Sequence, residues 1–99
     1  MIIYEVTAKV ASHLSDDYEQ YMRDRHIPDV LATGAFLSAG FYITENGVYQ
    51  VRYQAANQDA LENYINEHAT RLRKDVQDRF PSGVEFSRHE WSLIKTWKC

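Results

Sequence analysis

Apolar and polar residues alternate in three stretches of the chain, as they do in half-buried β-strands. In residues 1–10, MIIYEVTAKV, every even position is apolar. In residues 37–43 and 49–55 the odd positions are apolar. The sequence therefore predicts one strand at the start of the chain and two more near its middle.

The connection between the two middle strands is ENG, residues 45–47. A two-residue Asn-Gly turn would place Phe41 opposite Arg52 and mix the apolar and polar faces. A three-residue loop with Gly47 in the left-handed conformation places Phe41 opposite Val51, and residues that oppose each other across a ladder share a face. We therefore expect the three-residue loop, with a glycine bulge.

Apolar residues with helical spacing follow the first strand. They are Leu14, Tyr18, Tyr21 and Met22. Ser15, which precedes two aspartates, is a typical N-cap. Because Pro28 disfavours helical geometry at the residue before it, this helix is expected to end near Arg25 or His26. A short further turn then restarts with Pro28 near its first position and stops at Gly34.

A longer helix is predicted after the third strand. Asn57 can cap its N-terminus, and the helix is expected to run to about Arg79. Its inner stripe, spaced by three or four residues throughout, is Leu61, Ile65, His68, Leu72 and Val76.

The segment from Val84 to Trp97 is strand-like. Its alternation slips between Arg88 and Trp91, so a bulge or early fraying is expected. The order is therefore strand, helix, strand, strand, helix, strand. This order predicts an α+β, ferredoxin-like βαββαβ fold for residues 1–99 as a single domain, with a four-stranded antiparallel sheet and two helices on one face.

The opposite face of this sheet is less apolar. It carries Ile3, Glu5, Thr7, Lys9, Ser38, Gly40, Tyr42, Gln50, Arg52 and Gln54. Strands one and three are neighbours in this topology, so Glu5 and Arg52 are expected to pair across them.

Composition and charge exclude several classes of partner and site. A 99-residue domain buries only about 60 to 65% of its unfolded surface, so dimerisation would add stability. The net charge of -3 and the scattered lysines and arginines argue against nucleic acid and anionic membranes as partners. Residues 1–10 resemble neither a signal peptide nor a spanning helix, so a cytoplasmic location is expected. Cys99 is the only cysteine, which excludes an intrachain disulfide and a cysteine-based zinc site.

His26 is the strongest candidate for a catalytic residue, because a histidine at a helix C-terminus can titrate near neutrality. The alternative is a structural cap that binds the terminal carbonyls and holds the kink. His68, on the apolar stripe, is more simply explained as a hydrogen-bonded interior histidine. Arg71 and Arg73 could clamp a carboxylate or phosphate, lie on a solvated helix flank, or hold a dimer.

No motif for metal binding or nucleophilic catalysis stands out. None of the four histidines has a metal-ligand spacing, and His13 and His89 are isolated in the sequence. Nothing resembles a Ser-His-Asp or Cys-His arrangement, and the four glycines form no phosphate-binding loop. We therefore expect no metal and no cofactor.

Four segments resemble a known family. They are MIIYEVT at the start, MRDRHIPDVLATGAF at 22–36, YQVRYQA at 49–55 and HATRLRKD at 68–75. Together they are similar to the bacterial family catalogued as domain of unknown function 4286, over nearly the whole chain. That family resembles the dimeric α/β barrel superfamily, in which two ferredoxin-like sheets pack face to face around a cavity. The resemblance implies a homodimer and a pocket, and it implies no activity.

In such a barrel the less apolar sheet face lines a cavity. The candidate ligand-binding residues are then Glu5, Tyr42, Gln50, Arg52 and His89. The first hypothesis is a homodimer that binds or transforms a small polar molecule between the sheets, with His26 as the catalytic candidate. The second is a non-catalytic interaction or dimerisation module, and the choice between enzyme and non-enzyme stays open. RNA binding on an open sheet is a third, which the charge disfavours.

Overall fold

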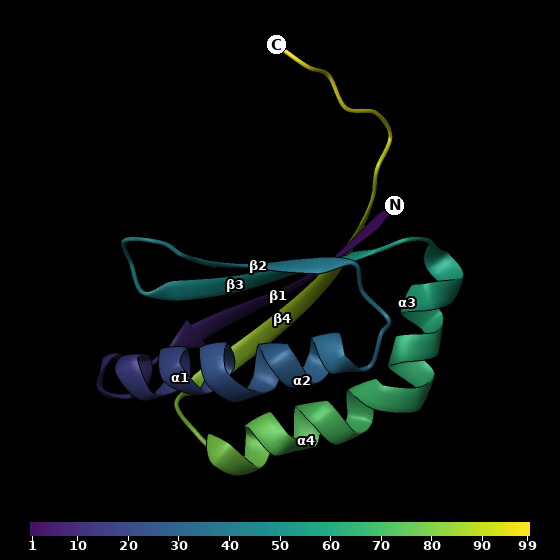
Figure 1. The fold of residues 1–99 in the computed structure, drawn as a ribbon. Helices are drawn as coiled ribbons and strands as arrows, with labels where there is room; N and C mark the ends of the chain where they lie inside the picture. The colour runs from purple at the N-terminus through teal and green to yellow at the C-terminus, as the bar shows by residue number, and fades with distance from the viewer.

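The computed structural model describes residues 1–99 as a sheet with helices on one face (Figure 1). The strands are β1 (Ile2–Val10), β2 (Ser38–Ile43), β3 (Val48–Ala55) and β4 (Val84–Ser92). The helical segments are α1 (Ser15–Tyr21) and α2 (Ile27–Ala32) after β1, and α3 (Gln58–Tyr64) and α4 (Thr70–Arg79) after β3. A π-helical turn joins the segments of each pair, Met22–His26 in the first and Ile65–Ala69 in the second. The predicted βαββαβ order and fold class are confirmed.

The strand order in the sheet is β2-β3-β1-β4, and every pair is antiparallel. Glu5 pairs with Arg52, as predicted from the topology. Phe41 pairs with Val51, and Gly47 has a φ of +77°, which confirms the three-residue loop between β2 and β3. The side-chain pattern therefore set the register correctly.

The first helix passes Pro28 without ending, and this differs from the prediction. The backbone stays helical over residues 15–32, but the turn Met22–His26 is π-helical. Pro28 has no N–H and its ring crowds the carbonyl four residues before it, and a wider turn accommodates both effects without breaking the helix. The predicted end near Arg25 or His26 is therefore wrong, and Pro28 lies at the start of α2.

The helix ends are partly as predicted. Gly34 has a φ of +78° just beyond α2, so it is the expected left-handed stop. Ser15 is the first residue of α1 and makes no capping hydrogen bond, because a 3-10 turn over residues 12–14 leads into the helix. The N-cap prediction for Ser15 is therefore wrong. Asn57 does cap α3, since its Oδ1 accepts a hydrogen bond from the Ala60 N–H at 2.9 Å.

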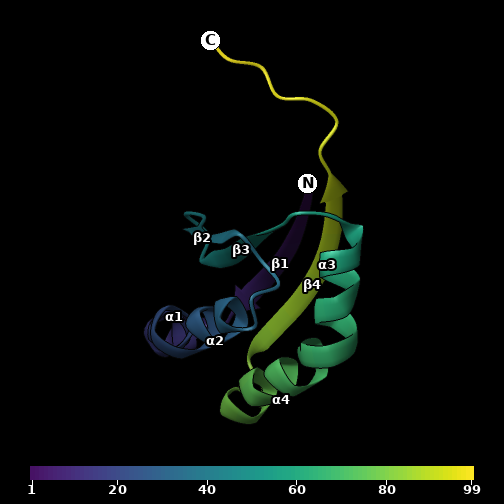
Figure 2. The ribbon, with the colours of Figure 1, turned by 45° about the vertical axis from the view of Figure 1, so that its right-hand side comes forward.

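The last strand is shorter than predicted. β4 pairs with β1 in continuous register from Val84 to Ser92, so no bulge is present. The strand pairing ends at Ser92, whose partner Ile2 is the first residue of β1, and one further backbone hydrogen bond runs from the Leu93 N–H to the Met1 carbonyl at 3.0 Å. Of the two predicted alternatives, a bulge or early fraying of the last strand, early fraying is confirmed. The chain beyond β4 extends away from the sheet in both views (Figures 1 and 2).

The core lies between the sheet and the helices, and every buried residue in it is hydrophobic. Leu37 and Ile43, predicted on the buried face, are 66% and 57% exposed. Leu37 directly precedes the edge strand β2, and Ile43 is its last residue. In the second helix the buried stripe also includes Tyr64, just before the π turn, and Ala69, the last residue of that turn. His68 is only partly buried and makes no hydrogen bond within the chain, so the expected interior role is wrong.

The Asn57 cap can be tested by mutation. Asn57→Ala should lower the free energy of unfolding by about 1 kcal/mol, because the amide N–H of Ala60 loses its acceptor. Asn57→Asp keeps an acceptor oxygen and should stay near wild-type stability. Urea denaturation with an unchanged slope would measure the difference. Equal stability of the Ala and Asp variants would contradict the assignment.

Candidate functional site

All the candidate site residues except His26 lie on the sheet face that no helix covers. Glu5 on β1 lies between Arg52 on β3 and His89 on β4. The Arg52 Nε is 3.7 Å from Glu5 Oε1, and the His89 Nδ1 is 3.8 Å from Glu5 Oε2. One carboxylate therefore faces a cation on one side and an imidazole on the other.

The remaining two candidates on this outer face complete the same network. The Arg52 Nε donates a hydrogen bond to Gln50 Oε1 at 2.7 Å, and the Gln50 Nε2 donates to Thr7 Oγ1 at 3.3 Å. The Arg52 guanidinium lies 5.4 Å from the centre of the Tyr42 ring. The polar groups of the outer face are thus largely paired with one another. Whether they also bind a ligand stays a prediction.

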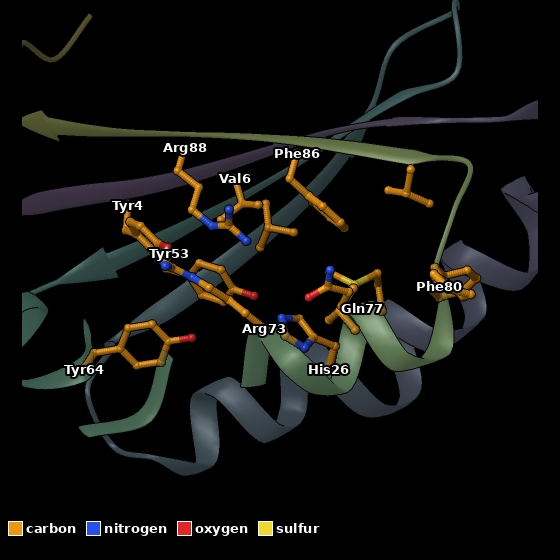
Figure 3. Close-up of a pocket in the computed structure, with 15 residues that line it drawn as sticks. Tyr4, Val6, His26, Tyr53, Tyr64, Arg73, Gln77, Phe80, Phe86 and Arg88 are labelled. Carbon is orange, nitrogen blue, oxygen red and sulfur yellow. Dashed lines mark hydrogen bonds between the residues drawn. The ribbon is translucent and has the colours of Figure 1, made fainter. Parts of the chain in front are cut away.

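His26 lies on the other side of the sheet, in a cavity between the strands and the helices (Figure 3). The cavity has a volume of about 330 Å³, and small-molecule sites begin at about 300 Å³. Ten of its fifteen lining residues are hydrophobic. Among the others are His26, Arg73, Gln77 and Arg88. The structure therefore separates the predicted site residues into two groups on opposite faces of the sheet.

Aromatic rings form one wall of the cavity. The ring of Tyr4 lies 6.1 Å from that of Tyr53 and 6.0 Å from that of Tyr64, centre to centre. Phe36 packs behind them, 5.0 Å from Tyr53 and 4.8 Å from Tyr64. Aromatic pairs at these separations stabilise one another beyond the surface they bury. The wall is therefore a cluster of packed aromatic rings, tilted by 29° between Tyr4 and Tyr53 and by 57° between Tyr4 and Tyr64.

The two π turns lie beside this cavity. His26 is the last residue of the first π turn, and Tyr64 directly precedes the second. A π turn inserts one residue into a helix and so changes which side chains face inward after it. Met22 and His26, at the two ends of the first π turn, both line the cavity. The turn that accommodates Pro28 is thus also the one that presents the imidazole.

The His26 ring is partly buried in the cavity wall and stacks near Tyr21, with ring centres 6.4 Å apart. Burial lowers the pKa of His26 from 6.5 to about 4. The charge of Arg88 adds to this lowering, and the carboxylates of Asp29 and Asp75 oppose it. The imidazole is therefore neutral at pH 7 and can accept a proton or a hydrogen bond. The expected capping role is wrong, because the helix continues past His26 and leaves no terminal carbonyls there.

The tyrosine hydroxyls in the cavity differ in their partners. Tyr4 accepts a hydrogen bond from Arg73 Nη2 at 2.7 Å. Tyr53 is 2% exposed, and its hydroxyl has no hydrogen-bond partner. Burial raises the pKa of Tyr53, and it raises that of Tyr64 to about 12, so both hydroxyls stay protonated at neutral pH. An unpaired buried hydroxyl costs about 1 to 3 kcal/mol, so Tyr53 marks an incomplete polar site.

Sequence reasoning missed Tyr53 and Arg88 as site residues. Arg88 did carry a signal, because it interrupts the apolar alternation of β4 on the face toward the helices. Tyr53 carried none, since a tyrosine at an apolar position usually belongs to the core. Of the arginine pair on the second helix, Arg73 lines the cavity and Arg71 is exposed.

Other site types have less support. No three histidine, cysteine, aspartate or glutamate side chains come together in a way that could hold a metal ion. Among the helices, none has both the length and the apolar character needed to cross a bilayer.

The neutral state of His26 predicts a pH dependence of stability. In the unfolded chain this histidine binds a proton below about pH 6.5, but in the folded chain it does so only near pH 4, so acid favours unfolding across that window. Between about pH 7 and about pH 4 the wild type should lose on the order of 2 kcal/mol more stability than His26→Gln. Urea denaturation at both pH values measures this, with His13→Gln, an exposed histidine, as the control. Equal losses in wild type and His26→Gln would contradict the burial of a neutral imidazole.

Comparisons with known proteins address the fold and the family. The model of the family described as domain of unknown function (DUF4286) matches residues 1–94. The search of curated proteins gave no match. A candidate antibiotic biosynthesis monooxygenase of Deinococcus radiodurans has a TM-score of 0.73 at 11% identity, over 100% of this chain and 98% of that one. Another structure, described as an antibiotic biosynthesis monooxygenase, has a TM-score of 0.69 at 13% identity, over 96% and 100%.

A de novo designed protein with a ferredoxin fold has a TM-score of 0.52 at 17% identity, over 99% of this chain and 93% of that one. At such identities these structures show the fold alone. They confirm the ferredoxin-like architecture that the sequence predicts. Since the family model accounts for residues 1–94, and the four segments that carry the resemblance all lie within them, this chain belongs to the DUF4286 family.

Proposed function

We propose that this protein is a homodimer that binds a small molecule in the cavity between its own sheet and helices. The observation that carries the proposal is the enclosed space itself, which combines an apolar wall with polar groups that point into it. The hydroxyl of Tyr53 points toward the middle of this space and has no partner within the chain (Figure 3). Buried polar groups normally find partners, so a ligand that supplies one would complete the site.

The aromatic lining of the cavity favours a ligand with an aromatic body. The stacked rings of Tyr4 and Tyr53 offer aromatic contacts, and Val51 and Val76 add apolar lining. The lining also includes Gln77 and Arg88, both of which are exposed to solvent, so the cavity opens between α4 and β4. A small molecule could therefore enter without unfolding the domain.

His26 is the residue we propose as the proton acceptor if the bound molecule reacts. It is a neutral imidazole on the cavity wall and so has a free ring nitrogen that can accept a proton, and the burial that lowers its pKa to about 4 makes it a weak base. Two proteins that share this fold are described as antibiotic biosynthesis monooxygenases, and small-molecule chemistry here would be in keeping with those descriptions.

The outer sheet face is the surface we propose for dimerisation. Tyr42 and Trp91 are 53% and 55% exposed there, on either side of the paired charges of Glu5 and Arg52. Interface centres favour aromatic anchors, and a charge that is already paired costs less to bury. A two-fold dimer would lay this face on its own copy, so that one surface supplies both sides of the interface. In that arrangement the polar residues of the outer face line the space between the sheets.

Ligand binding in the cavity can be tested with 2-naphthalenemethanol, a flat neutral probe. In a titration followed by protein NMR, the residues whose signals move should be those lining the cavity. Val76→Trp fills the space from α4 and should weaken binding at least tenfold, whereas Thr70→Trp, an exposed position on the same helix, should not. Circular dichroism would confirm that both variants fold. Signals that do not move, or binding that survives Val76→Trp unchanged, would refute the cavity as a ligand site.

The dimer can be tested by light scattering at micromolar concentration. The wild type should have a mass close to twice 11.6 kDa. Trp91→Glu places a charge in the proposed interface and should give the monomer mass. Ile94→Glu changes a residue that is 97% exposed beyond β4 and should leave the dimer intact. A wild-type monomer would rule out dimerisation.

A further inference from the structure

The cavity contains two guanidinium groups and no carboxylate. Arg73 enters from α4 and Arg88 from β4, so they approach from opposite sides (Figure 3). None of the residues that line the cavity is an aspartate or a glutamate. Neither arginine forms an ion pair, whereas Arg23, Arg52 and Arg79 each do. Arg25 and Arg71 also form no ion pair, but they are exposed and lie outside the cavity. Arg73 and Arg88 are therefore the unpaired cations that line this space.

The two arginines have spare hydrogen-bonding capacity. Arg73 uses one N–H on the Tyr4 hydroxyl, and a guanidinium has five. Arg88 makes no hydrogen bond from its side chain, and its guanidinium lies 5.6 Å from the centre of the Phe86 ring at the same wall. Two like charges in a space partly closed to water repel each other, and an anion placed between them would remove that repulsion.

Tyr53 gives independent support for an anion. Its buried hydroxyl has no partner, and burial keeps that hydroxyl protonated, so it remains a donor. Arg73 and Arg88 can only donate. A group that satisfies all three must accept hydrogen bonds, which excludes a cationic or purely donating ligand.

We propose that the missing acceptor is the carboxylate of a small organic acid, bound by Arg73, Arg88 and Tyr53, with its flat apolar body against the aromatic wall. This inference rests on the proposed function and names the class of ligand for the same cavity. Arginine matches a carboxylate with two parallel N–H···O bonds, which fixes the orientation of the acid. The apolar body then extends toward Val51 and Val76, and the neutral His26 adds no charge that would compete for the carboxylate.

The test compares two probes of the same shape by isothermal titration calorimetry. 2-Naphthoate carries the carboxylate, and 2-naphthalenemethanol carries a neutral hydroxymethyl group in its place. On the wild-type protein, 2-naphthoate should bind at least tenfold more tightly than the alcohol.

Variants assign the preference to particular side chains. Arg73→Gln and Arg88→Gln should each weaken 2-naphthoate binding at least tenfold and change binding of the alcohol less than threefold. Arg71→Gln removes the same charge from an exposed position of α4 and should change neither. Tyr53→Phe should weaken 2-naphthoate severalfold while the free protein is as stable as wild type or more so, because the lost hydroxyl had no partner. Arg88 is exposed at the mouth, so its replacement should leave the fold intact.

The outcomes separate the two proposals. If both probes bind with equal affinity and the arginine variants weaken them alike, the cavity is a ligand site without an anion subsite, and this inference fails alone. If Arg71→Gln and Arg88→Gln reduce the affinity for 2-naphthoate by the same factor, the preference for 2-naphthoate over the alcohol comes from the overall charge of the protein. The inference then also fails. If neither probe binds, the proposed function fails together with it.

Discussion

Tyrosine rings packed between the sheet and the helices are the feature on which the rest of the structure depends. Tyr4 and Tyr53 are cross-strand partners on β1 and β3, and Tyr64 packs against Tyr4 from the end of α3. Each ring contributes a large apolar surface to the core, but each also brings a hydroxyl that needs a hydrogen-bond partner. Arg73 donates a hydrogen bond to the Tyr4 hydroxyl, and the Tyr53 hydroxyl has no hydrogen-bond partner in the chain. The core and the polar part of the cavity are thus built from the same residues.

The charged side chains around Glu5 on the outer face of the sheet are paired, and the two arginines of the cavity on the inner face are unpaired. On the outer face the Glu5 carboxylate lies near Arg52 and His89, so the charges there are balanced within one chain. On the inner face Arg73 and Arg88 have no acidic neighbour among the residues that line the cavity. A balanced network loses less when another protein surface covers it, whereas unbalanced donors in a cavity gain most from a bound acceptor. This contrast is why we assign association to the outer face and ligand binding to the inner one.

The sequence could predict the elements and their pairing because these depend on local patterns. Alternation located the first three strands, the match of apolar faces set Phe41 against Val51, and Asn57 marked the start of the second helix. The same reasoning failed at Pro28. A proline allows either a break or a wider turn, and the sequence around it does not say which is better once the helix is packed on a sheet. The sequence correctly placed His26 near the change in helix geometry, but it did not predict that the imidazole lines a cavity.

By itself the sequence determined the ferredoxin-like order, the faces of the sheet and the pairing of Glu5 with Arg52, because periodicity reports the side toward which each residue points. Only the tertiary structure decided that a space remains on the buried side and that Tyr53, Arg73 and Arg88 meet there. Whether a buried face is completely filled depends on the summed volumes of side chains from distant parts of the chain. The spacing of residues within one segment does not report this summed volume.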